Sequence, residues 1–530
     1  MSFRPVMLCI LDGVGWGRRD ETDAVFMART PVLDGLMRDY PHTLLRAHGT
    51  AVGLPSEADM GNSEVGHNAM GAGRVVDQGA KLVDYAIASG ELFSTDAWLR
   101  IAACRTVHFI GLVSDGNVHS HVKHLNALID AAHAAGVARI RVHVLTDGRD
   151  VPDRSAPQWV GPLEARLAAL PDGAVASGGG RMSITMDRYE ADWQMVKRGW
   201  DTHVHGVGRP FPSASIALET LYAEDPKASD QWLAPFVVVR DGAPVGRIQD
   251  GDGVVLFNFR GDRAIELSRA FDDDDFPFFD RGFRPKVAYA GIMQYDGDLK
   301  VPRSFLVNPP AIDHTVGQYL VAAGVRTGAL SETQKYGHVT YFFNGNRSGR
   351  LDDTLEEYVE IPSDNVPFDQ APAMKAAAIA SRAAEMLRSG RFDFVRLNIA
   401  NGDMVGHTGN FAATVVAMEV VDAALGVLVE AARAVNAILL VTADHGNADL
   451  MVELDHRGRV VLAADGTPKA RTSHSLNPVP FILVDPLRQW RLVPPAGAGI
   501  ASVGGTLLAL FGVPLPEGYL PPLVTLAAQH

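Results

Sequence analysis

Residues 437–447, Ala-Ile-Leu-Leu-Val-Thr-Ala-Asp-His-Gly-Asn, decide the fold class of this chain. The first half is an apolar run typical of a strand that is buried on both faces of a parallel sheet. The run ends abruptly at Asp444 and His445. Ligands bind beyond the carboxyl ends of such strands, so both side chains are candidates to bind one ion. For this dipeptide alone, the alternative is a loop Asp that caps a helix beside a solvent-facing His.

The composition indicates a soluble globular protein with more than one core. The 530 residues leave room for two or more domains, and 47% are hydrophobic and 21% charged. The formal net charge of −14 argues against a nucleic-acid partner, because phosphate backbones require a basic face. The two cysteines, Cys9 and Cys104, indicate buried thiols in a reducing compartment. We find no apolar stretch of signal-peptide or membrane-span length, so we expect a cytoplasmic protein without a membrane partner.

Other predicted strands also end in side chains that can bind metal. The first strand of the chain ends at Asp12, which could equally be a turn residue. A strand at 393–400 leads to Asp403 and His407, whose spacing places both on one face of a helical turn. Three carboxylates and three imidazoles could hold two divalent ions, although they do not choose the metal. These six residues are Asp12, Asp403, His407, Asp444, His445 and His474.

Ser63 lies in a polar stretch between Gly61 and Gly66. It is either a nucleophile on a tight turn or the N-cap of a helix that Gly66 would interrupt. The chain has no G-x-S-x-G elbow around Ser63, so a hydrolase triad is not indicated. A serine without a histidine base can be activated by a metal instead.

The middle of the chain supplies arginines from loops. Strands at 107–114 and 139–145 with a helix between them predict a βαβ unit. Arginine is the side chain suited to a bidentate grip on phosphate or carboxylate, although each one singly could be an ordinary surface residue. We interpret 271–280 as a solvated loop and 297–311 as a linker between domains. The arginines are Arg149, Arg181, Arg188, Arg260 and Arg263.

Taken together, the motifs closely resemble the family of cofactor-independent phosphoglycerate mutases, in the alkaline phosphatase superfamily. The resemblance covers nearly the whole chain, and the combination of motifs is highly specific. The segment from Arg181 to Arg188 is one residue longer than the form common in that family. The motifs are LDGVG (11–15), GNSEVGH (61–67), SDGNVHSH (114–121), DGRD (147–150), NFRGDRA (258–264), SETQKYGHVT (331–340), DMVGHTG (403–409), TADHGN (442–447) and SHSLNPVP (473–480).

The resemblance implies an α/β fold of two domains. An alkaline-phosphatase-like, metal-binding domain of residues 1–76 and 312–530 would be interrupted by an inserted substrate-binding transferase domain of residues 77–311. It also implies two divalent ions, with manganese favoured, and no requirement for 2,3-bisphosphoglycerate. We expect a monomer whose partner is a small molecule.

The resemblance further implies a role for each motif residue. Ser63 would be the nucleophile that becomes phosphoserine, Lys335 would neutralise phosphoryl charge, and Asp150 would carry protons. One ion would bind Asp403, His407 and His474. The other would bind Asp12, Ser63, Asp444 and His445. Substrate contacts would come from His119, Arg149, Asp150, Arg181, Arg188, Arg260, Arg263 and Lys335.

The implied activity is interconversion of 3-phosphoglycerate and 2-phosphoglycerate, a step of glycolysis and gluconeogenesis. One alternative is a metal-dependent phosphatase or another phosphomutase of the superfamily. The arginines of the inserted segment argue against a simple phosphatase, which need not hold its dephosphorylated product. A second alternative is a catalytically inactive metal-binding or scaffold protein, against which the complete ligand set with Ser63 and Lys335 argues.

Overall fold

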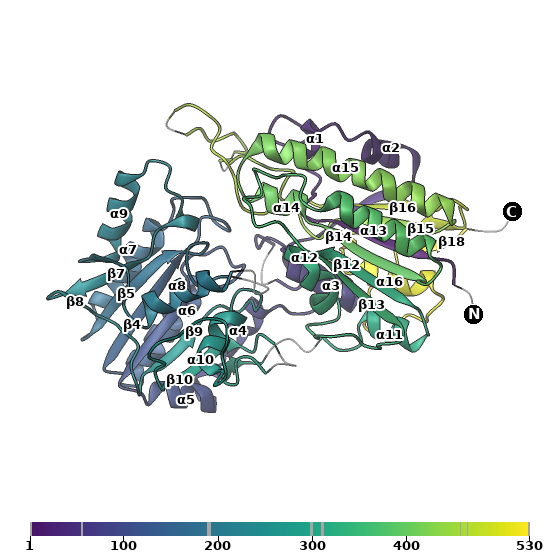
Figure 1. The fold of residues 1–530 in the computed structure, drawn as a ribbon. Coiled ribbons are helices and arrows are strands. Elements are labelled where there is room, and N and C mark those ends of the chain that lie inside the picture. The colour runs from purple at the N-terminus through teal and green to yellow at the C-terminus, as the bar shows by residue number, and fades with distance from the viewer. Residues whose placement is uncertain are drawn as a thin grey trace. The chain divides into compact units, whose positions relative to one another are not determined.

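The structure, a computed structural model, describes residues 3–54, 57–187, 192–296, 300–308, 312–455, 457–463 and 465–527. The chain divides into two compact units (Figure 1). The first unit comprises Met1–Gln78 and Ala311–His530, and the second comprises Gly79–Pro310. Each unit is an α/β fold with its own sheet.

The sheet of the first unit has the strand order β13-β12-β14-β1-β15-β16-β2. Its central strand β1 pairs in parallel with β14 and β15. At one edge, β16 is antiparallel to β15, and β2 is antiparallel to β16. The three central strands are buried throughout, which explains their continuous apolar sequences. The strands are β1 (Val6–Leu11), β2 (His42–Leu45), β12 (Thr327–Glu332), β13 (Glu356–Ile361), β14 (Phe394–Ile399), β15 (Ile438–Thr442) and β16 (Val479–Val484), with a separate pair β17 (Trp490–Leu492) and β18 (Val524–Leu526).

Helices cover both faces of this sheet. α13 and α15 lie on one face, and α3, α11 and α16 lie on the other (Figure 1). The helices are α1 (Ala24–Met27), α2 (Pro31–Asp39), α3 (Ser63–Ala72), α11 (Val316–Ala322), α12 (Thr333–Gly337), α13 (Ala376–Arg388), α14 (Asn401–Gly406), α15 (Phe411–Ala434) and α16 (Ser502–Leu510), with a 3-10 turn at Gly49–Val52 and a π-helical turn at His338–Phe342.

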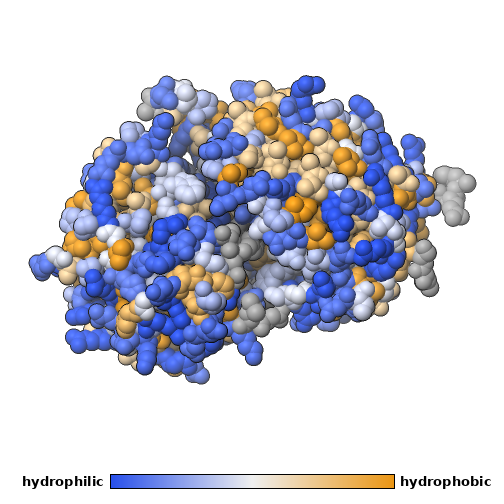
Figure 2. All heavy atoms as spheres, in the orientation of Figure 1, coloured by the Kyte–Doolittle hydropathy of each residue, from blue (hydrophilic) through white to orange (hydrophobic). Residues whose placement is uncertain are grey.

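The helix α15 corrects the expectation that no segment reaches the length and apolarity of a membrane span. It has 24 residues and a mean hydropathy of 2.0 in its most apolar window. That window is 56% buried, as in the core helix of a globular domain. Val416 and Val427 remain exposed, and apolar atoms gather over this region in Figure 2. By itself the helix is weak evidence for a membrane.

The sheet of the second unit has the order β11-β10-β9-β3-β4-β5-β7-β6, with β8 paired to β7. Its strands are β3 (Thr106–Leu112), β4 (Arg139–Thr146), β5 (Gly173–Gly180), β6 (Arg209–Phe211), β7 (Phe236–Arg240), β8 (Ala243–Pro244), β9 (Gly253–Leu256), β10 (Ala288–Met293) and β11 (Phe305–Val307). Its helices are α4 (Gly79–Ala88), α5 (Asp96–Ala102), α6 (Val122–Ala134), α7 (Pro157–Ala168), α8 (Trp193–His203), α9 (Ala214–Glu224) and α10 (Ile265–Asp272), with 3-10 turns at Leu92–Ser94 and Asp230–Trp232. The central parallel strands β9, β3, β4 and β5 place their carboxyl ends at one edge of this sheet.

One sequence interpretation at the end of the second unit was right only in part, and another was wrong. The boundary between the two units falls between Pro310 and Ala311, within the expected linker. The expected linker 297–311 contains β11, which pairs with β10, although residues 297–299 and 309–311 lie outside the described part. The expected solvated loop 271–280 contributes packed aromatic rings. Phe278 stacks on Trp193 at 3.9 Å between centroids, and Phe279 is buried. The run of four acidic residues at 272–275 concealed this apolar cluster in the sequence.

Candidate active site

The candidate site of the first unit lies where β1, β14 and β15 end, and Lys335 is its cationic centre. Lys335 follows β12, on α12, and is buried. Its Nζ lies 2.9 Å from Asp12 Oδ1 and 2.8 Å from Asp403 Oδ2, and it also donates to Ser63 Oγ. The ammonium therefore joins two carboxylates to the predicted nucleophile.

Three of the predicted ligands form a compact group with converging lone pairs. Asp403 Oδ1 lies 2.9 Å from His407 Nε2 and 3.1 Å from His474 Nε2. His407 Nδ1 lies 2.6 Å from the carbonyl of Thr472, and His474 Nδ1 lies 2.8 Å from the carbonyl of Gly61. Each Nδ1 must donate to its carbonyl, so each ring in its neutral form turns an unprotonated Nε2 toward the other. A cation fits this donor set, because two neutral rings supply no proton to separate the three acceptor atoms.

The remaining predicted ligands surround Ser63. Ser63 Oγ lies 3.0 Å from His445 Nε2 and 3.3 Å from Asp12 Oδ1. His445 Nδ1 lies 3.2 Å from the Gly446 carbonyl, which again leaves Nε2 free to bind a cation. The buried Oδ2 of Asp444 lies 3.8 Å from His445 Nε2 and has no hydrogen-bond partner among the described residues. An unsatisfied buried carboxylate oxygen of this kind is expected at a cation site.

The carboxylates carry opposite pKa shifts in the protein alone. Burial and the charge of Asp12 raise the pKa of Asp444 well above its usual range. Burial also opposes ionisation of Asp403, yet while no cation is bound a protonated His407, and then Lys335, hold its pKa well below the usual range. Lys335 similarly overcomes burial and lowers the pKa of Asp12. The site therefore carries more carboxylate than Lys335 neutralises, and divalent cations would supply the missing charge.

Ser63 is the first residue of α3, and Asn62 is the N-cap, so the expectation of Ser63 as a possible N-cap is corrected. The helix also runs through Gly66 instead of stopping there. A Cβ at Gly66 would lie 2.7 Å from the carbonyl oxygen of Asp444, so glycine lets α3 approach this loop. A phosphoryl group on Ser63 would lie at the positive end of a ten-residue helix.

Other residues that hold the ligands were missed in the sequence. Asn398 donates to Asp12 Oδ2 at 2.7 Å, and Asn447 donates to Asp403 Oδ1 at 3.3 Å. His67 Nδ1 lies 3.4 Å from Asp444 Oδ2, and burial lowers the pKa of His67 to about 4. Asn398 is a polar residue inside a buried strand, and Asn447 and His67 lie within recognised motifs. These features of the sequence could have identified all three residues as part of the site.

The predicted substrate residues of the second unit gather around His119. Burial first, and then the charges of nearby arginines, lower the pKa of His119 well below its usual value. Its ring is therefore neutral, and it lies in a field of positive charge suited to an anion. The arginines are Arg181, Arg260, Arg263 and Arg149, and each is buried. Arg188 lies outside the described residues.

Acidic side chains orient two of these arginines. Arg181 Nη1 donates to Asp147 Oδ1 at 2.7 Å and also to Asp150. Arg260 Nη2 donates to Asp262 Oδ2 at 3.0 Å. Sequence reasoning missed Asp147 and Asp262, although both stand in the quoted motifs beside predicted site residues. Buried charges held in this way are preorganised to bind a charged ligand.

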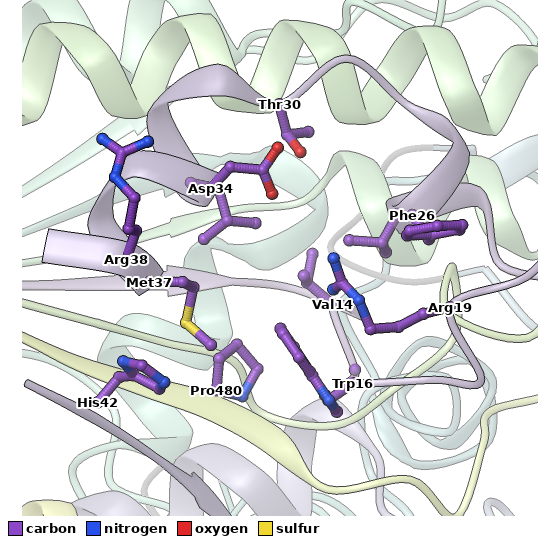
Figure 3. Close-up of a pocket in the computed structure, with 13 residues that line it drawn as sticks. Val14, Trp16, Arg19, Phe26, Thr30, Asp34, Met37, Arg38, His42 and Pro480 are labelled. Carbon is purple, nitrogen blue, oxygen red and sulfur yellow. The ribbon is translucent and has the colours of Figure 1, made fainter. Parts of the chain in front are cut away.

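A separate pocket of about 320 Å³ lies in the first unit (Figure 3). Arg19 lies over the rings of Trp16 and Phe26, at 4.3 and 5.0 Å from their centroids. The lining residues do not include any of the six Asp and His candidate ligands, Ser63 or Lys335. We therefore give this pocket no part in the candidate site.

Buried carboxylates and imidazoles at the strand ends of an α/β sheet indicate a metal-dependent enzyme. The family model of the Metalloenzyme superfamily matches residues 4–515 of this chain. A relative from Leptospira interrogans, named probable 2,3-bisphosphoglycerate-independent phosphoglycerate mutase, is 53% identical over 98% of this chain and 97% of its own length. The 2,3-bisphosphoglycerate-independent phosphoglycerate mutase of Trypanosoma brucei brucei is 51% identical, over 99% of this chain and 98% of its own. Phosphoglycerate mutase of Leishmania mexicana, crystallised at low cobalt concentration, superposes with a TM-score of 0.97 at 49% identity, covering 99% of this chain and 98% of that one. This chain belongs to the family of 2,3-bisphosphoglycerate-independent phosphoglycerate mutases.

Proposed function

We propose that this chain interconverts 3-phosphoglycerate and 2-phosphoglycerate through a phosphoserine at Ser63, without 2,3-bisphosphoglycerate. The observation that carries the proposal is the position of Ser63 Oγ, which contacts Lys335 Nζ, His445 Nε2 and Asp12 Oδ1 at the N-terminus of α3. The names of the relatives supply the substrate class.

Two divalent cations would be held by the two ligand groups, Asp403 with His407 and His474, and Asp12 with Ser63, Asp444 and His445. Manganese is the proposed metal because carboxylate ligands favour it, whereas imidazole ligands alone would suit zinc or iron. Such cations neutralise phosphoryl charge and lower the pKa of a hydroxyl beside them.

The protein side chains of the first unit act on the phosphoryl group. Ser63 would react as an alkoxide, whose formation the cations would favour. Its Oγ attacks phosphorus in line with the departing substrate oxygen, and that oxygen takes a proton from Asp150 as its bond to phosphorus breaks. The Lys335 ammonium stabilises the negative charge on Ser63 Oγ and on the equatorial phosphoryl oxygens. Asn398 and Asn447 keep Asp12 and Asp403 in place while this charge moves.

The side chains of the second unit act on the glycerate. The buried arginines hold its carboxylate, and this retention allows the phosphoryl group to return to the other hydroxyl. Asp150 carries the proton between the two hydroxyls. Asp147 is suited to keep Asp150 and Arg181 in place, since all three are buried in one hydrogen-bonded group.

This function divides the chain into a metal-binding phosphoryl-transfer part, residues 1–76 with 312–530, and a glycerate-binding part, residues 77–311. We propose a cytoplasmic monomer that acts on a small-molecule substrate. The net charge of −14 supports the absence of a nucleic-acid partner.

A coupled assay for 2-phosphoglycerate tests the proposal. The enzyme receives 3-phosphoglycerate and manganese, with and without 2,3-bisphosphoglycerate, and released inorganic phosphate is measured in parallel. We expect 2-phosphoglycerate in both reactions at equal rates. Release of phosphate without 2-phosphoglycerate would identify a phosphatase and overturn the proposal.

A further inference from the structure

A line of buried polar side chains crosses the sheet of the second unit, and no step above uses it. His108 lies on β3, His143 on β4 and Ser177 on β5, three neighbouring strands. The line begins at a carboxylate just before β9, and it ends at His203 on α8 and a threonine in the loop after β5. We call the six residues the histidine network: Asp252, His108, His143, Ser177, His203 and Thr185.

Every link of the histidine network has hydrogen-bond length. His108 Nε2 lies 3.1 Å from Asp252 Oδ2, and His108 Nδ1 lies 3.0 Å from His143 Nε2. The Oγ of Ser177 lies 2.7 Å from His143 Nδ1 and 2.9 Å from His203 Nδ1. His203 Nε2 then lies 2.9 Å from Thr185 Oγ1.

An irregularity in the sheet brings Ser177 into line. Val142 pairs with Val175, but the next residue, His143, pairs with Ser177, so Ala176 is an extra residue in β5. A bulge of this kind redirects the side chain that follows it. Without it, an apolar alanine would stand opposite His143 and the network would be broken.

The carboxylate at one end fixes the direction of every proton. Asp252 Oδ2 also accepts from the backbone N–H of Gln249, so it acts as an acceptor and His108 Nε2 is the donor. Neutral imidazole has one N–H, so His108 Nδ1 must accept from His143 Nε2. By the same rule Ser177 donates to His143, and His203 Nδ1 donates to Ser177. Thr185 Oγ1 is left as the donor to His203 Nε2.

The three imidazoles are neutral, as this arrangement requires. Burial lowers the pKa of His203 to about 3, with a smaller contribution from His108. Burial lowers the pKa of His143 well below its usual value, and the nearby Arg141 also contributes. Burial lowers the pKa of His108 as well, although Asp252 opposes that shift.

The far end of the network holds a strained residue beside the substrate arginines. Thr185 has a φ of +70°, which is unfavourable for a β-branched side chain. Its backbone N–H donates to the Met195 carbonyl at 3.0 Å. The carbonyl of the following residue, Met186, accepts a hydrogen bond from Arg263 Nη1 at 2.6 Å. Arg181 is the first residue of the same segment, 181–187. The conformation of Thr185 therefore sets the position of a contact to Arg263.

We propose that the histidine network is a positioning device for substrate binding, which holds Thr185 and thereby aims the segment 181–187 and Arg263. This inference rests on the proposed function. A buried polar chain is costly unless every group is bonded, and an apolar core would fill the same space at less cost. Orientation of the segment 181–187 for substrate binding accounts for a buried polar network with this free-energy cost.

Thr185→Val is the direct test, because it keeps the β-branched shape and removes the hydroxyl. We expect KM for 3-phosphoglycerate to rise about five- to tenfold, as for one lost buried hydrogen bond, with kcat nearly unchanged. Thr185→Ser keeps the hydroxyl and should restore KM. Thr202→Val is the matched control, since Thr202 is also buried in this unit but donates to the Arg198 carbonyl of its own helix. Equal KM values for Thr185→Val and Thr202→Val would overturn the inference.

A second pair of variants tests the opposite end and serves if Thr185→Val does not fold. Asp252→Ala removes the acceptor, whereas Asp252→Asn keeps an oxygen there. In ¹⁵N spectra of histidine-labelled protein, we expect His203 to be a single Nδ1–H tautomer in the wild type and a mixture in Asp252→Ala. An unchanged His203 tautomer in Asp252→Ala would contradict the network.

Calorimetric binding of 3-phosphoglycerate to the wild-type protein separates this inference from the proposed function. If the wild type binds no 3-phosphoglycerate, the proposed function fails. If the wild type binds it and Thr185→Val binds equally well, only the positioning inference fails.

Discussion

The Nε2 atoms of His407 and His474 lie 3.0 Å apart in the buried site, and each ring donates its Nδ1 proton to a backbone carbonyl. Two bare imidazole nitrogens beside Asp403 Oδ1 require either a cation or an added proton between them. Protons and metal therefore compete for the same lone pairs, with free imidazole titrating near a pKa of about 6.5.

Activity should fall on mild acidification, and excess manganese should move the midpoint to lower pH. This direction of the pH effect follows because protonation removes a histidine as a metal ligand. Metal binding is therefore complete above the imidazole pKa and lost below it. The measurement is the pH profile of activity at two manganese concentrations, with circular dichroism as a control for folding. A midpoint that does not depend on manganese would place the acid effect elsewhere, for example at Asp150.

Replacement of Ser63 by alanine should abolish mutase activity and leave the fold intact. Six candidate metal ligands remain, so most of the bound metal should also remain. Ser502→Ala is the matched control, because Ser502 is likewise a buried first residue of a helix in the same unit. Substantial turnover by purified, folded Ser63→Ala would exclude Ser63 as the phosphoryl carrier.

Arg263→Ala should raise KM or shift the reaction from transfer toward hydrolysis. Loss of a buried charge-assisted contact costs about 2 kcal/mol, which corresponds to roughly a 30-fold change in KM. Steady-state kinetics with a parallel phosphate assay gives both quantities. Arg209→Ala is the control, since Arg209 forms an exposed ion pair with Glu224 in the same unit. Kinetics identical to this control would exclude Arg263 from glycerate binding.

Conformational stability should decrease as the pH falls from about 7 to about 5. His203 has a folded-state pKa of about 3, whereas an unfolded histidine titrates near about 6.5. Between these values the unfolded chain binds a proton that the folded chain does not, so acid favours unfolding. The slope should approach about 1.4 kcal/mol per pH unit for this residue below its unfolded pKa.

Denaturant unfolding of wild type and His203→Asn over this pH range measures that slope. The variant should lose the part of the slope that comes from one proton, whatever its stability at neutral pH. Parallel curves for the two proteins would show that His203 is not the neutral buried group described above.

The parts of the site that the sequence predicts best are those carried by local patterns. An apolar run that ends in Asp or His, as at Asp12 and Asp444, marks a strand end directly, and parallel pairing then brings such ends to one edge. Asp403 and His407 could be paired from their spacing alone. These contacts follow from the periods of helices and strands.

The histidine network could not be predicted in this way. His108 and His143 look like isolated polar residues in apolar strands, and their contact depends on the order of β3 and β4 in the sheet. Ser177 reaches the network only through a bulge that no residue pattern announces. The packed phenylalanines at 271–280 were hidden for a similar reason, since their partner Trp193 is remote in sequence.

The central claim is that the phosphoryl group passes through Ser63, and acid quenching tests it most directly. Enzyme, manganese and 3-phosphoglycerate are mixed and quenched within a turnover, and the digested protein is analysed by mass spectrometry. The account predicts one added phosphoryl group on the peptide that contains Ser63, absent from Ser63→Ala and present from either phosphoglycerate isomer. An active enzyme that never carries phosphate on Ser63, or that carries it on another residue, would contradict the account.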